Sequence, residues 1–108
     1  MIVQEQFDYY NEQNLPKFLE LFSENVIVSN FNGSGPAIEG KENFTTTYER
    51  LFQDYPMNRA ELLHRIVIRN RVIDHEKVFR SGGTSATFEC VAIYTIENEK
   101  IVRIDFIK

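Results

Sequence analysis

Residues 62–79 place side chains that can do chemistry inside a pattern typical of buried strands. The segment is LLHRIVIRNRVIDHEKVF, two β-branched runs joined by a turn at Asn70-Arg71. A buried and unpaired charge is costly, so each ionisable residue here must face water, pair with another group or line a pocket. The segment therefore predicts a fold with a pocket. The residues in question are His64, Arg65, Asp74, His75, Glu76 and Lys77.

The turn at Asn70-Arg71 sets the expected register of this hairpin. It places Arg65 opposite Glu76, as a cross-strand ion pair worth about 0.2–1 kcal/mol. Because side chains alternate between the two faces of a strand, Asp74 and Glu76 then lie on the face opposite His75. We therefore expect a site that contains His75 to exclude both carboxylates. A slip of one residue in the register would change this assignment.

The elements that must position these residues follow from the rest of the pattern. Apolar residues recur at helical spacing over residues 2–13, then after the favourable N-cap Asn14, and again over residues 44–52. We therefore expect one α+β domain over residues 1–108, with three N-terminal helices packed on a curved, mostly antiparallel sheet. The expected sheet elements are a short strand at 26–31, a Gly/Pro-rich loop at 32–40, and strands at about 59–69, 72–80, 86–96 and 100–107.

Composition and charge exclude several classes of protein. The chain has 108 residues, 43% of them hydrophobic, a net charge of −4 and a pI of about 5.2. This acidity argues against nucleic acid or an anionic membrane as a partner. No apolar stretch reaches the roughly 18 residues that a membrane span needs. The N-terminus has no signal-peptide pattern, and the single cysteine, Cys90, excludes an intrachain disulfide. These features predict a cytoplasmic protein.

Several segments together carry a family resemblance. They are FSENVIVSNF at 22–31, Gly40 before a helix with Tyr48, and AIYTIENEKIVRIDF at 92–106. The chain resembles the SnoaL-like branch of the NTF2-like superfamily, whose relatives include ketosteroid isomerases and polyketide cyclases. The resemblance implies a cone-shaped sheet wrapped around helices. It also implies an apolar pocket inside the cone and, frequently, a dimer formed through the outer sheet face.

The isomerase residues of the family match this chain at one position. The catalytic Asp falls on Asn30, whose amide cannot abstract a proton. The oxyanion-stabilising Tyr falls on Gln6 and the second oxyanion acid on Ala92, while the tyrosine of the third helix is present as Tyr48. The resemblance therefore does not carry over ketosteroid isomerisation by that mechanism.

The same resemblance implies a mainly apolar pocket for a small apolar carbonyl compound, without cofactor or metal. Since His75 is the group expected there that titrates near neutral pH, our hypothesis is that it is a general acid/base. Asn30 and Tyr48 would then orient a carbonyl or enolate. The alternative is that His75 hydrogen-bonds Tyr48 or a backbone carbonyl inside a filled core. The implied pocket wall is Gln6, Tyr10, Phe22, Asn30, Tyr48, Ile66, His75, Ala92, Tyr94, Ile104 and Phe106.

Two classes of function remain open. One is an enzyme of the isomerase, cyclase or hydratase kind, and the other is a non-catalytic ligand-binding or dimeric scaffold domain. A limonene-epoxide-hydrolase-like reaction would need an inward Asp/Arg/Asp set, and Asp74, Arg103 and Asp105 are expected to face outward. The apolar outer face predicts a homodimer. Its expected aliphatic residues are Val67, Val72, Val78, Val91, Ile93, Ile101 and Ile107.

Overall fold

The computed structural model describes residues 1–33 and 35–108 and contains three helices and six strands within them. The helices are α1 (Ile2–Asn11), α2 (Leu15–Leu19) and α3 (Lys41–Asp54). The strands are β1 (Phe22–Asn30), β2 (Pro36–Glu39), β3 (Arg59–Ile68), β4 (Arg71–Phe79), β5 (Phe88–Glu97) and β6 (Lys100–Ile107).

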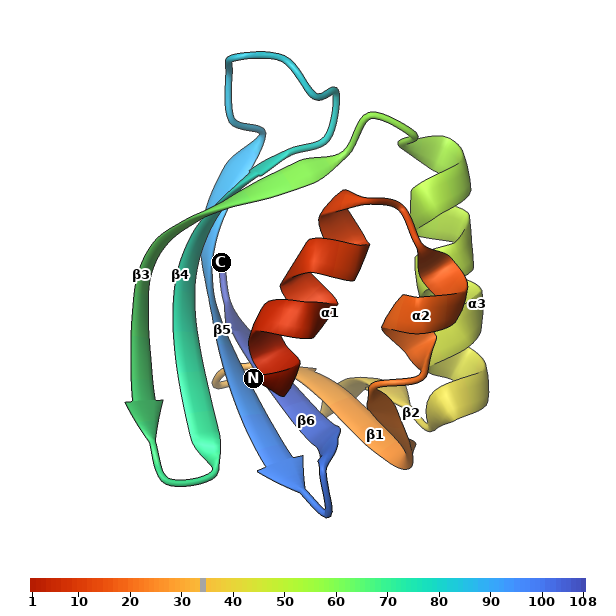
Figure 1. Ribbon diagram of the computed structural model, residues 1–108, viewed down its shortest axis with the longest axis vertical. Coiled ribbons are helices and arrows are strands. Elements are labelled where there is room, and N and C mark those ends of the chain that lie inside the picture. The colour runs from red at the N-terminus through yellow and green to blue at the C-terminus, as the bar shows by residue number, and fades with distance from the viewer. Residues whose placement is uncertain (34) are drawn as a thin grey trace.

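The six strands form one curved sheet in the order β2-β1-β6-β5-β4-β3. Neighbouring strands are antiparallel except for β1 and β6, which run parallel. The strand order places β6 between β1 and β5, inside the sheet. The sheet bends around α1, and α2 and α3 lie on the same concave side (Figure 1). This arrangement confirms the predicted α+β fold with helices packed on a mostly antiparallel sheet.

The first half of the chain differs from prediction in three details. The second helix is short, five residues, and Asn14 caps it by accepting a hydrogen bond from the Lys17 amide. The third helix is not N-terminal, since it follows β1 and β2. Part of the predicted 32–40 loop is strand β2, which pairs with β1. Its first residue is Pro36, a position that tolerates proline in an edge strand.

The turn of the β3–β4 hairpin comes one residue earlier than predicted, which shifts the pairing of the two strands by two residues. Ile68 pairs with Arg71, so the turn residues are Arg69 and Asn70. Asn70 is held by two hydrogen bonds to the backbone of Ile96 in β5, a contact that the local sequence does not reveal. Arg65 consequently lies opposite Asp74, and the predicted pairing of Arg65 with Glu76 is wrong.

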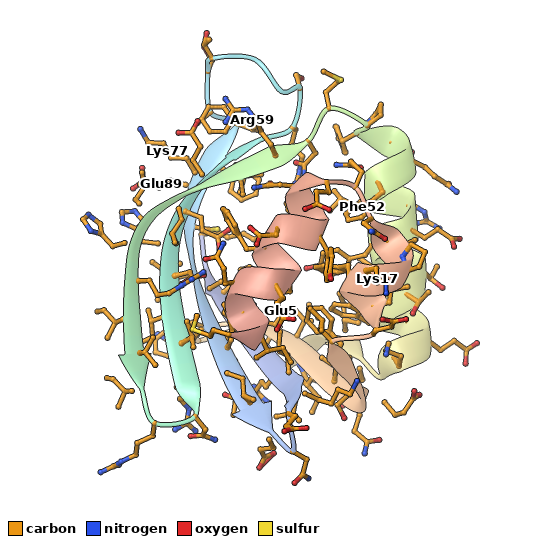
Figure 2. All side chains as sticks on the ribbon, in the orientation of Figure 1. Glu5, Lys17, Phe52, Arg59, Lys77 and Glu89 are labelled. Carbon is orange, nitrogen blue, oxygen red and sulfur yellow. The ribbon has the colours of Figure 1, made fainter. Side chains whose placement is uncertain are left out.

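A shift of two residues preserves the alternation, so Asp74 and Glu76 still share one face of β4 and His75 and Lys77 the other, as predicted. The structure differs from the prediction in which of these two faces lies toward the helices. The buried residues of this strand include Asp74 and Glu76, and their neighbours His75 and Lys77 lie on the outer face. Figure 2 shows Lys77 with Glu89, its partner on β5, on the side of the sheet away from the helices. The prediction that His75 points inward and both carboxylates outward is therefore wrong.

The outer face keeps part of its predicted composition. Three predicted members, Val72, Val78 and Ile101, are instead buried inside the cone. The outer surface also carries exposed isoleucines that were not expected there: Ile66 is 54% exposed and Ile68 is 55% exposed. The apolar character of this face thus persists with a different set of residues.

Aromatic side chains hold the helices against the sheet. Phe18 of α2, Phe22 of β1 and Phe44 of α3 are each almost completely buried. The ring centroids of Phe22 and Phe44 are 4.4 Å apart, and those of Phe44 and Tyr48 are 4.5 Å apart. A second, smaller core cluster surrounds Cys90. Burial of several aromatic rings dominates the energetics of a core of this size.

No helix in the part of the chain that the structure describes is both long enough and apolar enough to cross a membrane.

Candidate functional site

A cavity of about 380 Å³ lies between the two core clusters. All three helices contribute to its wall, together with β1, β2, β4, β5 and β6. Its volume is within the usual range for small-molecule sites, which are mainly apolar with a few convergent polar groups. The cavity is therefore the candidate functional site.

Most of the predicted pocket residues line this cavity. Phe22 and Ala92 are buried in the larger core cluster and do not reach the cavity wall. Ile66 lies on the outer face. The predicted residues that the structure brings together are Gln6, Tyr10, Asn30, Tyr48, Tyr94, Ile104 and Phe106.

His75 does not line the cavity. Its Nε2 contacts Oε1 of Glu89, and its ring stacks beside that of His64 with the centroids 5.8 Å apart. All three residues belong to the outer face, because they occupy the strand positions that alternate with the buried ones. His75 is therefore in the wrong place to act on a ligand in the cavity.

The cavity contains an acid that the sequence analysis had placed outside, Glu76. It is 7% exposed, and its Oε2 accepts no hydrogen bond from any described residue. The pKa of Glu76 is raised to about 7, chiefly because the carboxyl group is buried and in part because of the nearby Asp74 carboxylate, while Arg65 opposes the shift. A carboxyl group with a pKa near neutrality can give or take a proton at physiological pH.

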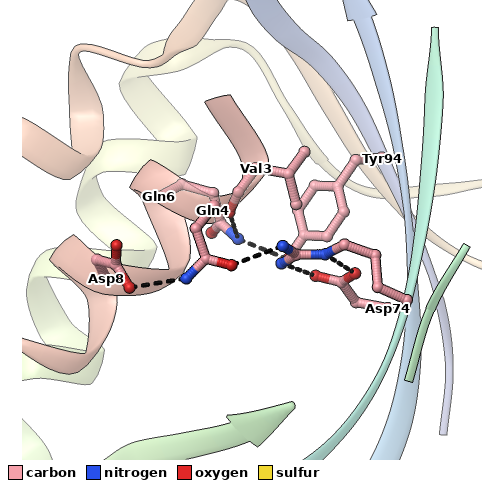
Figure 3. A network of polar contacts seen from close by, with 7 residues as sticks. Val3, Gln4, Gln6, Asp8, Asp74 and Tyr94 are labelled. Atoms are coloured by element: carbon pink, nitrogen blue, oxygen red, sulfur yellow. Dashed lines mark hydrogen bonds and ion pairs between the residues drawn. The ribbon is translucent and has the colours of Figure 1, made fainter. Parts of the chain in front are cut away.

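The neighbouring acid, Asp74, is neutralised by an ion pair. Arg65 Nε and Nη2 donate to the two oxygens of Asp74, at 2.7 and 2.9 Å, and Asp74 is completely buried. The third contact of the guanidinium, from Nη1, goes to Oε1 of Gln4 on α1 at 2.6 Å (Figure 3). Asp74 is thus engaged with Arg65, whereas Glu76 keeps a free carboxyl oxygen.

Two buried phenols in the cavity wall stay neutral. Burial raises the pKa of both Tyr48 and Tyr94. Gln6 Nε2 donates a hydrogen bond to Tyr94 Oη at 3.1 Å and another to the Val3 carbonyl at 3.0 Å. A neutral phenol is a hydrogen-bond donor, so Tyr48 and Tyr94 can stabilise negative charge on a ligand oxygen. The amide of Asn30 is a further donor in the wall.

The sequence alone does not show that Glu76 faces the cavity. Val72 and Val78 flank the acidic residues on one face of β4, and Ile73 and Phe79 flank the basic ones on the other. Both faces are therefore equally apolar, and alternation alone does not reveal which of them is inward. In the structure the acidic face is the inward one, and there Arg65 compensates the buried Asp74.

No cluster of histidine, cysteine and acidic side chains suited to a metal ion occurs in residues 1–33 and 35–108.

Comparison with known proteins gives one matching family. A family model described as a SnoaL-like domain matches residues 3–104. No curated protein matches the chain.

Many solved structures share the fold. A cystatin-fold protein from Novosphingobium aromaticivorans is 25% identical, with a TM-score of 0.87, and the match covers 99% of this chain and 95% of that one. A candidate polyketide cyclase from Sinorhizobium meliloti is 18% identical, with a TM-score of 0.76 and coverages of 97% and 92%. A candidate ketosteroid isomerase from Kribbella flavida is 14% identical, with a TM-score of 0.75 and coverages of 98% and 73%.

The raised pKa of Glu76 predicts a pH-dependent stability. The folded protein holds the Glu76 proton up to a pH of about 7, whereas the unfolded chain releases it near 4.5, so stability falls as the pH rises between these values. The replacement Glu76→Gln removes the titrating carboxyl group, so the variant does not lose stability from its ionisation as the pH rises. The stability of the variant relative to wild type should improve by about 3 kcal/mol between pH 4 and pH 9, measured by urea unfolding.

The control is Glu97→Gln, which removes an exposed carboxylate at the end of β5. It should leave the pH profile of the wild type unchanged. Equal profiles for wild type and Glu76→Gln would show that Glu76 titrates as an ordinary surface acid.

Replacement of Arg65 tests the buried ion pair. Arg65→Gln leaves the Asp74 carboxylate buried without its charged partner, so the free energy of unfolding should fall by about 3–5 kcal/mol. The double replacement Arg65→Gln with Asp74→Asn removes both charges and should recover most of the loss. Denaturant unfolding of the three proteins measures this difference, and equal stabilities for the single and double variants would contradict it.

Proposed function

Since the chain belongs to the family of SnoaL-like domains, we propose that its cavity binds a small, mainly apolar carbonyl compound and that Glu76 acts on it as a general acid and base. The observation that carries the proposal is that Glu76 lines an apolar cavity with a buried carboxyl group, one oxygen of which accepts no hydrogen bond from the described residues. Two structures with this fold bear the names of a candidate polyketide cyclase and a candidate ketosteroid isomerase, which supports carbonyl chemistry.

The proposed reaction begins with removal of a proton. The ionised Glu76 takes a proton from the carbon next to the ligand carbonyl, and the electron pair of the C–H bond moves into an enolate. Hydrogen bonds from Tyr48, Tyr94 or the Asn30 amide stabilise the negative enolate oxygen. Where a carbon–carbon double bond adjoins the deprotonated carbon, the enolate is a conjugated dienolate. The protonated Glu76 then returns its proton to the far carbon of the dienolate, which moves the double bond without any cofactor.

The base in this proposal differs from that of the isomerases that the chain resembles. Their catalytic Asp corresponds by resemblance to Asn30, on β1, whereas Glu76 reaches the same cavity from β4. A base supplied by another strand leaves Asn30 available as a hydrogen-bond donor. The loss of an acid at this position is also the observation that favours the second candidate function, a ligand-binding domain without catalysis.

The proposed chemistry is tested by proton exchange. A panel of small cyclic ketones and enones is incubated with the protein in D₂O, and the incorporation of deuterium next to the carbonyl is followed by NMR. The exchange rate should rise as the pH passes about 7, because the ionised Glu76 is the base. Glu76→Gln should lower the rate by about 100-fold or more.

The matched control is His75→Gln, on the same strand but on the outer face. It should retain the exchange activity of the wild type. Binding of a ketone with no exchange by wild-type protein would favour the non-catalytic function, and loss of activity in His75→Gln would contradict the role given to Glu76.

We also propose that the outer face joins two copies of the chain. Exposed isoleucines of β3, together with the 44% exposed Ile107 of β6, give this face an apolar surface. The basic His75 and Lys77 lie on it beside the acidic Glu89, so a two-fold contact could pair opposite charges.

Light scattering at micromolar concentration should give the mass of a dimer. Ile66→Glu puts a charge in the middle of the face and should shift the mass to that of a monomer. Met57→Glu, in the exposed connection before β3, is the control and should leave the dimer intact. A monomeric wild-type protein would refute the proposal.

A further inference from the structure

Three basic side chains line the cavity. Lys108 and Arg50 are exposed and Arg80 is half-buried, whereas Glu76 and Tyr94 are buried. The cavity wall thus contains three basic residues and two acidic ones, Asp54 and Glu76. This local excess of positive charge contrasts with the net charge of −4 of the whole chain.

Arg80 is held in place by neutral partners. Its Nη1 donates hydrogen bonds to Oη of Tyr10 at 3.0 Å and to Oδ1 of Asn58 at 2.7 Å. Its guanidinium lies 5.1 Å from the ring centre of Phe88 and 5.7 Å from that of Tyr55. The group is therefore positioned by contacts that leave its charge uncompensated.

The other nitrogen atoms of Arg80 remain available. Nε and Nη2 donate to no atom of residues 1–33 and 35–108. A guanidinium carries five N–H donors in a planar arrangement that matches the two oxygens of a carboxylate. Arg80 can therefore bind an anion while it keeps both of its present hydrogen bonds.

Lys108 lies close to the same aromatic ring. Its Nζ is 5.5 Å from the ring centre of Phe88 and 5.1 Å from that of Phe106, and both rings belong to the cavity wall. None of the ion pairs found among the described residues includes Lys108 or Arg80. Arg80 and Lys108 thus both lie near the ring of Phe88, without an acidic partner among the described residues. An external anion can bind between them.

We propose that the cavity binds an anionic group of the ligand between Arg80 and Lys108, while the apolar part of the ligand extends to Glu76. The inference rests on the proposed function and narrows its substrate to small apolar carbonyl compounds that carry an anionic group such as a carboxylate.

The strand sets the distance between the two ends of such a compound. Glu76, Val78 and Arg80 all face the cavity and follow one another at every second residue. Four residues of extended chain span roughly 13 Å. The anionic group should therefore be separated from the reacting carbon by several bonds, which excludes the shortest 2-oxo acids as good ligands.

Two fluorescent probes with one skeleton test this inference. The anionic probe is 6-anilinonaphthalene-2-sulfonate, and the neutral probe is N-phenyl-2-naphthylamine, which lacks the sulfonate. Wild-type protein should bind the anionic probe more tightly, and this preference should shrink as salt is added because salt screens charge. Competition between the probes establishes that they occupy the same site.

Variants assign the preference to Arg80. Arg80→Gln should weaken binding of the anionic probe by about tenfold and leave the neutral probe within about twofold. Arg80→Lys retains the charge and should keep part of the preference. The control Arg71→Gln removes an exposed charge at the opposite end of β4 and should change neither affinity.

The outcomes separate this inference from the proposed function. Binding of the neutral probe without any preference for the anionic one would overturn the anion site and leave the cavity as a ligand site. Failure of both probes to bind would overturn both. Equal weakening of the two probes by Arg80→Gln, with Arg80→Lys behaving like wild type, would show a structural role for Arg80 and overturn the anion site.

Discussion

The ion pair between Arg65 and Asp74 is the constraint on which the inner surface of the sheet depends. Two charges can be buried together only when each compensates the other, and this pair does so with two hydrogen bonds. Its presence lets the acidic face of β4 turn toward the helices. The contact from Arg65 to Gln4 then ties the two outermost strands of this side to α1.

The Arg65–Asp74 pair also affects the ionisation of Glu76 in the cavity. Because Arg65 is committed to Asp74, its charge compensates Glu76 only in part, and burial determines the behaviour of the Glu76 carboxyl group. The cavity thus has an ionisable centre, with neutral phenols around it and basic groups in the same wall.

The sequence predicts the helices and strands better than it predicts the faces they present. Helical spacing around Phe44 and alternation around Tyr94 locate their elements closely, because each pattern is local. The hairpin register depends on the contact of Asn70 with Ile96, far along the chain. Strand β2 likewise exists only because β1 is beside it. The inward position of Glu76 was missed for a different reason: both faces of β4 carry apolar residues, so alternation separates the two faces without showing which of them packs on the helices.

The position of β6 between β1 and β5 has a consequence for how the chain acquires its structure. Phe22 of β1 pairs with Ile101 of β6, so this contact closes most of the chain into a loop. During synthesis, β1 and β2 must wait for the last strand before they can join the rest of the sheet. Because such non-local pairing is slow, the apolar faces of the N-terminal strands remain exposed longest on the nascent chain, where they are most open to aggregation.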